Sequence, residues 1–195
     1  MRASFERPYT FTEACQLADL VVEVIITEWL GELDEYGIGE TTYFRAKVLQ
    51  VYHDSWGLAS DEFVILQEGN SQWTYRGYPL FRNGERMLLS LKELDEDLDR
   101  FFFMEGEDCF RIVGAQMTEL LVVEKDGREY AMKRTPGYNF TDIEKFRERG
   151  TASIFNEALK NDHALSRSWS EDECVYELDT LTDLIEDTGR SNRNE

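Results

Sequence analysis

Residues 1–135 carry the alternation of apolar and polar positions that is typical of β-strands. In residues 40–53, Phe44 and Ala46 fall on one face, and Arg45 and Lys47 fall on the other. A run that is apolar on nearly every residue, at 86–91, predicts a central strand that is buried on both faces. Other strands are predicted at 20–30, 63–68, 101–104, 110–113, 120–124 and 130–133.

Turn residues separate these strands. Gly77 and Pro79 indicate a turn, because glycine allows positive φ and proline fixes φ without donating a hydrogen bond. Asn83-Gly84 is a strong turn dipeptide just before the central strand. Residues 125–128 (KDGR) predict a hairpin turn between the last two strands. Many short strands with close turns favour a small barrel or sandwich, and no strand–helix–strand alternation is visible.

Helical patterns flank the strands. Residues 12–19 predict a short helix, capped by Thr10 or Thr12 and with Glu13 in its first turn. After Pro136, Thr141 and Glu144 have the spacing of a capping box. Helices are predicted at 142–149, 151–161 and 171–187; in the last, Cys174, Leu178, Leu181 and Ile185 share one face.

The order of these segments resembles the OB-fold barrel of netrin-like and tissue-inhibitor-of-metalloproteinase-like domains, and more closely bacterial proteins of that shape. The resemblance covers roughly residues 11–124. It is carried by ADLVV at 18–22, VLQVY at 48–52, and GYPLFRNGERMLLSL at 77–91. It implies an OB-like β-barrel. Together with the helical patterns and the polar C-terminal residues, we expect a mainly β fold with helices: an OB-like barrel at 1–135, a C-terminal helical extension at 136–188 and a disordered tail at 189–195.

The inhibitors of this shape chelate a protease zinc through an N-terminal Cys-x-Cys, whereas this sequence begins Met1-Arg2-Ala3-Ser4. Protease inhibition is therefore not expected. The three cysteines, Cys15, Cys109 and Cys174, are far apart and form no CxxC pair, which favours buried free thiols.

The formal net charge is −19, from 40 acidic and 21 basic residues. Such a surface repels phosphate backbones, so we expect no nucleic-acid partner, while a protein partner fits. No apolar run is long enough for a membrane span. We expect a cytoplasmic protein if Met1 is the native start, and an extracellular or cell-surface protein if an export signal preceded it. The pattern does not fix the oligomeric state.

The sharpest acidic motif is ELDEDLD at 93–99, in which Asp95, Asp97 and Asp99 alternate as at the start of a calcium loop. The motif then fails, because Arg100 stands where the loop needs glycine and Gly106 where it needs glutamate. A solvated turn and a weak cation site are the two interpretations, and no cofactor is expected.

Aromatic residues gather at 73–81, where Trp73, Tyr75, Tyr78 and Phe81 could pack the barrel mouth or contact a partner. We therefore expect a non-enzymatic binding or interaction module with an acidic surface, and these four residues are its candidate binding site. One alternative is a hydrolase that uses the carboxylates at 95–99 and 105–108. The other is an acidic decoy or immunity-type protein for a basic partner.

Overall fold

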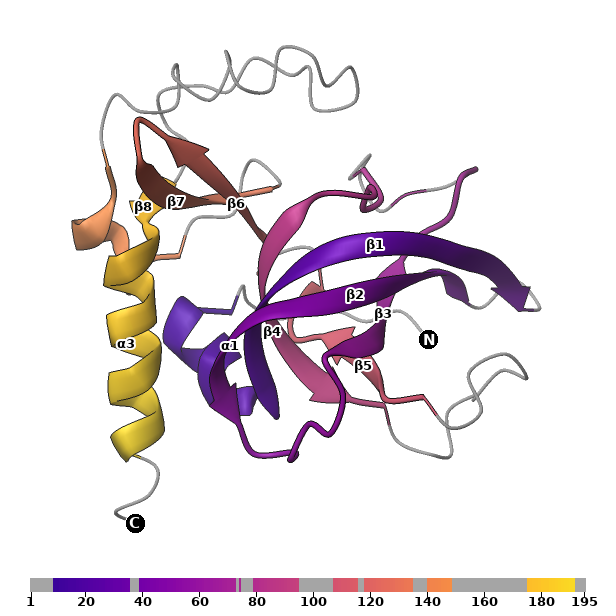
Figure 1. Ribbon diagram of the computed structural model, residues 1–195, viewed down its shortest axis with the longest axis horizontal. Coiled ribbons are helices and arrows are strands. Elements are labelled where there is room, and N and C mark those ends of the chain that lie inside the picture. Colours follow the sequence, from indigo (N-terminus) through magenta and orange to yellow (C-terminus); the bar gives the residue numbers. More distant parts are fainter. Residues whose placement is uncertain are drawn as a thin grey trace.

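The computed structural model describes residues 9–35, 39–72, 74, 79–94, 107–115, 118–134, 140–148 and 175–191. Figure 1 shows a strand-rich body with one long helix along its side. The strands are β1 (Leu20–Glu35), β2 (Gly39–Asp54), β3 (Glu62–Glu68), β4 (Arg86–Glu93), β5 (Cys109–Ile112), β6 (Leu120–Lys125), β7 (Arg128–Lys133) and β8 (Val175–Glu177). The helices are α1 (Phe11–Leu17), the 3₁₀ turn η3 (Glu144–Phe146) and α3 (Leu178–Ser191).

The first five strands form a closed barrel. They are hydrogen-bonded in the order β1-β2-β3-β5-β4, and β1 also pairs with β4, which closes the ring. Strands β3 and β5 are parallel, and the other barrel pairs are antiparallel. A closed five-stranded barrel with this connection pattern is OB-like, which confirms the predicted fold class.

The barrel interior follows from the alternation seen in the sequence. Phe44 and Ala46 of β2 are buried in the core, while Arg45 and Lys47 face outward as predicted. Four register shifts along the β1–β2 pair bend these 16-residue strands around the barrel. The predicted central strand is β4, whose residues Met87 to Leu91 are all buried.

A second layer covers one side of the barrel. Strand β6 pairs with β4 and carries the sheet on through β7 to β8, and in Figure 1 α1 lies between α3 and the barrel. Leu178, Leu181 and Ile185 of α3 pack with α1 and β6 in a second hydrophobic cluster. The KDGR hairpin turn is confirmed, with positive φ at Asp126 and Gly127.

The prediction for 171–187 was wrong in its first part. Val175–Glu177 is a strand that pairs with β7, and the helix begins only at Leu178. The cause is tertiary: the free edge of β7 offers hydrogen bonds that a helix could not use. The segment 136–188 is thus partly built into the barrel's own sheet, and α3 continues to Ser191, inside the predicted tail.

The capping box at Thr141 was also wrong. The segment 142–149 contains only the 3₁₀ turn η3, whose N-cap is Ile143 and has no side-chain cap. Asp142 instead caps α1, because its carboxylate accepts from the backbone nitrogens of Phe11 (3.1 Å) and Thr12 (2.9 Å). A carboxylate at a helix N-terminus is favoured by the helix dipole. Thr10 caps α1 and Glu13 lies in its first turn, as predicted, and the two residues also form a capping box.

The predicted strand at 101–104 and the predicted helix at 151–161 lie outside the described residues. In the part of the chain that is described, no helix is both long and apolar enough to cross a membrane.

Candidate functional site

The aromatic residues predicted as a binding site divide into two groups. Trp73, Tyr75 and Tyr78 lie outside the described residues. Phe81 is 4% exposed, and its ring packs edge-to-face on Phe44 with 5.4 Å between centroids. The Phe81 ring is therefore part of the barrel core and presents no contact surface.

Most of the predicted acidic site residues lie outside the described residues. Asp95, Asp97 and Asp99 lie outside the described residues. Glu107 binds Arg45 through two hydrogen bonds of 2.8 and 3.1 Å. Across the described ranges, no group of three His, Cys, Asp or Glu residues is placed to hold a metal ion.

The prediction of buried free thiols is confirmed for Cys15 and Cys109. Burial raises the pKa of the Cys15 thiol to about 12, against a weaker lowering by its contact with Ser90. Since the thiolate is the reactive form, Cys15 is inert at neutral pH. Cys174 lies outside the described residues.

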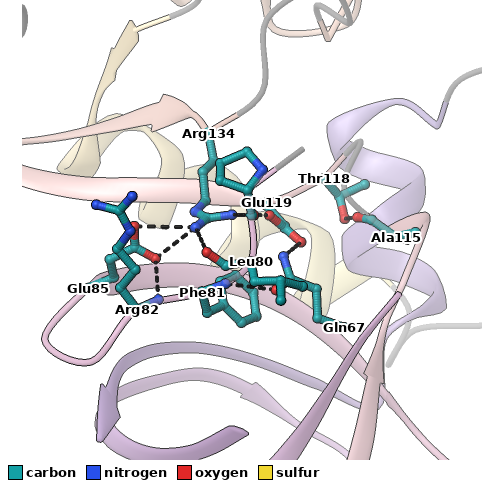
Figure 2. A network of polar contacts seen from close by, with 10 residues as sticks. Gln67, Leu80, Phe81, Arg82, Glu85, Ala115, Thr118, Glu119 and Arg134 are labelled. Atoms are coloured by element: carbon teal, nitrogen blue, oxygen red, sulfur yellow. Dashed lines mark hydrogen bonds and ion pairs between the residues drawn. The ribbon is translucent and has the colours of Figure 1, made fainter. Parts of the chain in front are cut away.

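A buried polar network joins the end of β7 to the segment that leads into β4 (Figure 2). Arg134, whose side chain is 0% exposed, binds Glu85 at 3.0 Å and Glu119 at 3.4 Å. The same guanidinium donates to the carbonyls of Pro79 and Leu80. One arginine thus fixes both the backbone of this segment and two carboxylates.

Gln67 of β3 extends the network into the barrel. Its amide nitrogen donates to Glu119 Oε1 at 2.9 Å, and its amide oxygen accepts from the backbone nitrogen of Phe81 at 2.8 Å (Figure 2). Burial raises the pKa of the Glu119 carboxyl, while Arg134 and Gln67 oppose the rise and the charge of Glu85 adds to it. Both oxygens of Glu119 accept hydrogen bonds from the protein, so the polar atoms of this buried side chain have partners within the fold.

A cavity of about 530 Å³ opens beside this network. Its lining includes outward-facing side chains of β4 and β5, Lys92 and Arg111, and also Gln67 and Ile112, which lie on the core-facing side of β3 and β5. Tyr9 and Leu17, at the two ends of the α1 region, contribute to its wall. A volume of this size is in the range of small-molecule sites, roughly 300–1,000 Å³.

The lining of the cavity combines apolar surface with a few charged groups. Leu17 is 47% exposed although it is large and apolar. Partial burial raises the pKa of the Glu68 carboxyl. The apolar lining residues include Leu17, Leu66, Leu94, Ile112 and Val113, and the polar ones are Tyr9, Thr41, Gln67, Glu68, Lys92, Arg111 and Glu119.

Two cations lie side by side in this lining. Lys92 of β4 and Arg111 of β5 are direct cross-strand partners, and Arg111 is also level with Leu66 of β3. Both cations are exposed. Like charges directly opposite each other in a sheet are destabilising. Among the described residues, neither cation has an ion-pair partner, whereas the other basic residues of the barrel strands do: Arg45, Lys47 and Arg86.

Gly114 allows the cavity wall to close. Its φ is +74°, and a Cβ there would meet both Thr118 Cγ2 and Tyr9 Cδ2 at 2.9 Å. Only glycine permits this conformation together with so close an approach of Tyr9. The sequence analysis did not identify Gly114 or the Lys92–Arg111 pair. Contacts between distant parts of the chain place these residues at the cavity, and such contacts leave no local pattern in the sequence.

The fold and the cavity define an OB-like barrel with a ligand-sized cavity at β3, β4 and β5. The sequence matches no protein-family model, and comparison with curated proteins finds no relative.

Proposed function

We propose that the protein is a non-enzymatic binding module that takes a small ligand in the cavity over β3, β4 and β5. The observation that supports this function is the cavity itself: its volume of about 530 Å³ and its mixed apolar and charged lining are typical of ligand sites. OB-like barrels also bind through one barrel face and its adjoining loops. We also propose that the barrel is of the netrin-like type, because residues 11–124 resemble that type in sequence.

Binding is favoured over hydrolysis by the way the carboxylates are used. A hydrolase needs a carboxyl group that is free to exchange a proton with substrate. Glu119 is fully buried and both of its oxygens accept hydrogen bonds from the protein. Glu107, from the acidic cluster first considered for hydrolysis, is bound by Arg45.

A thermal-shift screen with neutral, cationic and anionic small molecules tests the proposed function. At a ligand concentration 100 times Kd, binding stabilises the folded state by about 2.7 kcal/mol, which raises Tm by roughly 5–10 °C in a chain of this size. We expect at least one charge class to give such a shift with the wild-type protein. The matched variant is Leu17→Trp, which enlarges a half-exposed side chain at the cavity wall.

The Leu17→Trp variant should keep the wild-type Tm without ligand and lose the ligand-induced shift. A wild-type protein that none of the three classes stabilises would contradict the proposed function. A ligand that stabilises both proteins equally would place binding elsewhere and would contradict the proposed site.

A further inference from the structure

We propose that the ligand of this cavity is a small organic monoanion, whose carboxylate binds between Lys92 and Arg111 and whose apolar part packs against Leu17 and Leu66. This inference rests on the proposed function and names its ligand class. It is carried by the cation pair and by the cavity that the pair lines.

The placement of the two cations is the first step. In a chain with a formal net charge of −19, carboxylates are abundant partners for basic residues. Arg45, Arg86 and Arg134 each bind two carboxylates. In the described part of the chain, Lys92 and Arg111 bind none and instead face each other across adjacent strands. An anion between them would remove their mutual repulsion.

The chemistry of the two side chains is the second step. Arginine offers a planar fork of donors that matches a carboxylate, and lysine adds a compact ammonium group. Cross-strand partners in an antiparallel pair lie close enough for both side chains to reach one bound group. A single carboxylate can therefore accept hydrogen bonds from Arg111 and Lys92 together.

The charge balance of the lining favours a monoanion. Lys92 and Arg111 bring two positive charges to the cavity, and the carboxyl groups of Glu68 and Glu119 also line it. These carboxyl groups repel a ligand more strongly the more negative charge it carries. A carboxylate with a single charge therefore suits the lining better than a phosphate dianion.

The apolar lining residues indicate that the remaining part of the ligand is apolar. Leu17 is 47% exposed on α1, and Leu66 lies next to Arg111 in the sheet register. Leu94, Ile112 and Val113 complete the apolar surface. Covering these side chains removes apolar area from water, which favours a ligand with a hydrocarbon portion. A medium-chain carboxylate combines both features.

Isothermal titration calorimetry with octanoate, 1-octanol and inorganic phosphate tests this inference. The variants are Lys92→Glu and Arg111→Glu, and the control is Lys125→Glu, which makes the same change in net charge on the β6–β7 hairpin. Among the described residues, Lys125 has no ion-pair partner either. Octanoate should bind the wild-type protein, and 1-octanol and phosphate should bind at least tenfold more weakly.

Each cavity variant should weaken octanoate binding by tenfold or more, since a charge-assisted hydrogen bond contributes at least a factor of ten. The Lys125→Glu control should stay within about twofold, by the same scale. Equal binding of octanoate and 1-octanol, unchanged in Lys92→Glu, would overturn the anion inference and leave the proposed function standing. Phosphate binding without octanoate binding would overturn the inference that the ligand is an organic monoanion. No binding of any probe, together with an empty thermal-shift screen, would overturn both proposals.

Discussion

Two polar regions of this molecule lie near the same cavity and are built in opposite ways. Around Arg134, one buried cation is surrounded by two carboxylates, two carbonyls and an aromatic ring. At Lys92 and Arg111, two exposed cations face each other, and no carboxylate among the described residues binds either of them. Gln67 and Glu119 belong to the first region and also line the cavity of the second.

The difference between these regions separates stability from binding. A buried charge without partners is costly, so the carboxylates and carbonyls around Arg134 stabilise the folded chain. An exposed like-charge pair costs little, and it can persist where a ligand supplies the missing charge. The Arg134 network fixes the backbone beside the cavity, and the Lys92–Arg111 pair gives the cavity two cations that can bind a ligand.

The largest effect is expected from Arg134→Met. Loss of the guanidinium would leave Glu85 and Glu119 buried without their cation. It would also leave the carbonyls of Pro79 and Leu80 without their donor. Breaking a buried ion pair in this way costs about 3–5 kcal/mol of unfolding free energy. Urea denaturation measures this cost.

Arg128→Met is the matched control, because Arg128 is 71% exposed and pairs with Glu177 at 3.2 Å. An exposed pair contributes roughly 0–1 kcal/mol. If the two variants lost similar amounts of stability, the network around Arg134 would contribute no more to folding than an exposed ion pair.

The next effect is expected from Gly114→Ala, which tests whether the cavity wall is fixed. The positive φ alone costs a non-glycine residue about 1–3 kcal/mol. Contact of the new Cβ with Tyr9 and Thr118 would add to this. Gly127→Ala separates the two causes, since Gly127 has φ +75° and no atom within 4 Å of a Cβ. A Gly114→Ala cost no larger than that of Gly127→Ala, measured by urea denaturation, would show that Tyr9 does not press against this wall.

Glu119 gives the network a pH dependence. Its pKa is raised above the ordinary 4.5 in the folded state, so between pH 4.5 and the folded-state pKa the folded protein holds a proton there that the unfolded chain has lost. This contribution to stability is complete below pH 4.5 and disappears as the pH rises through the folded-state pKa. Each tenfold difference in proton affinity between the two states is worth about 1.4 kcal/mol.

Glu119→Gln removes this titration. The stability of the variant relative to the wild-type protein should therefore increase as the pH rises from 4.5, in urea denaturation at several pH values. Glu129→Gln, at a side chain that is 42% exposed, is the control for the loss of one carboxyl group. A difference between Glu119→Gln and the wild-type protein that does not change with pH would mean that the pKa of Glu119 is not raised.

The smallest effect on stability is expected from Lys92→Glu, and its sign is informative. A carboxylate at position 92 would face Arg111 directly and replace repulsion by attraction. We expect a gain of about 0.2–1 kcal/mol, together with the loss of octanoate binding. A destabilised Lys92→Glu protein would indicate that Lys92 already has a favourable partner.

The sequence predicted the barrel well because its information is local. Alternation in residues 40–53, the apolar run at 86–91 and the KDGR turn each determine a structure within a few residues. Where tertiary contacts decide, the predictions were wrong. Asp142 caps a helix about 130 residues away, and Val175–Glu177 becomes a strand because β7 has a free edge.

The candidate site could not be predicted for the same reason. Lys92 and Arg111 are ordinary surface cations in the sequence, and only the β4–β5 register makes them partners. Arg134 follows a short strand and shows no local sign of the two distant carboxylates that it binds. Of the predicted aromatic site, Phe81 belongs to the core, and the other three residues lie outside the described ranges.

The most direct test of the central claim is to follow backbone amide shifts of the ¹⁵N-labelled wild-type protein by NMR while octanoate is added. The account predicts saturable shifts that are largest at Leu66, Arg111 and Val113, which line the cavity, and small at Lys125 on the hairpin. Absence of saturable shifts, or shifts concentrated away from the cavity, would contradict it.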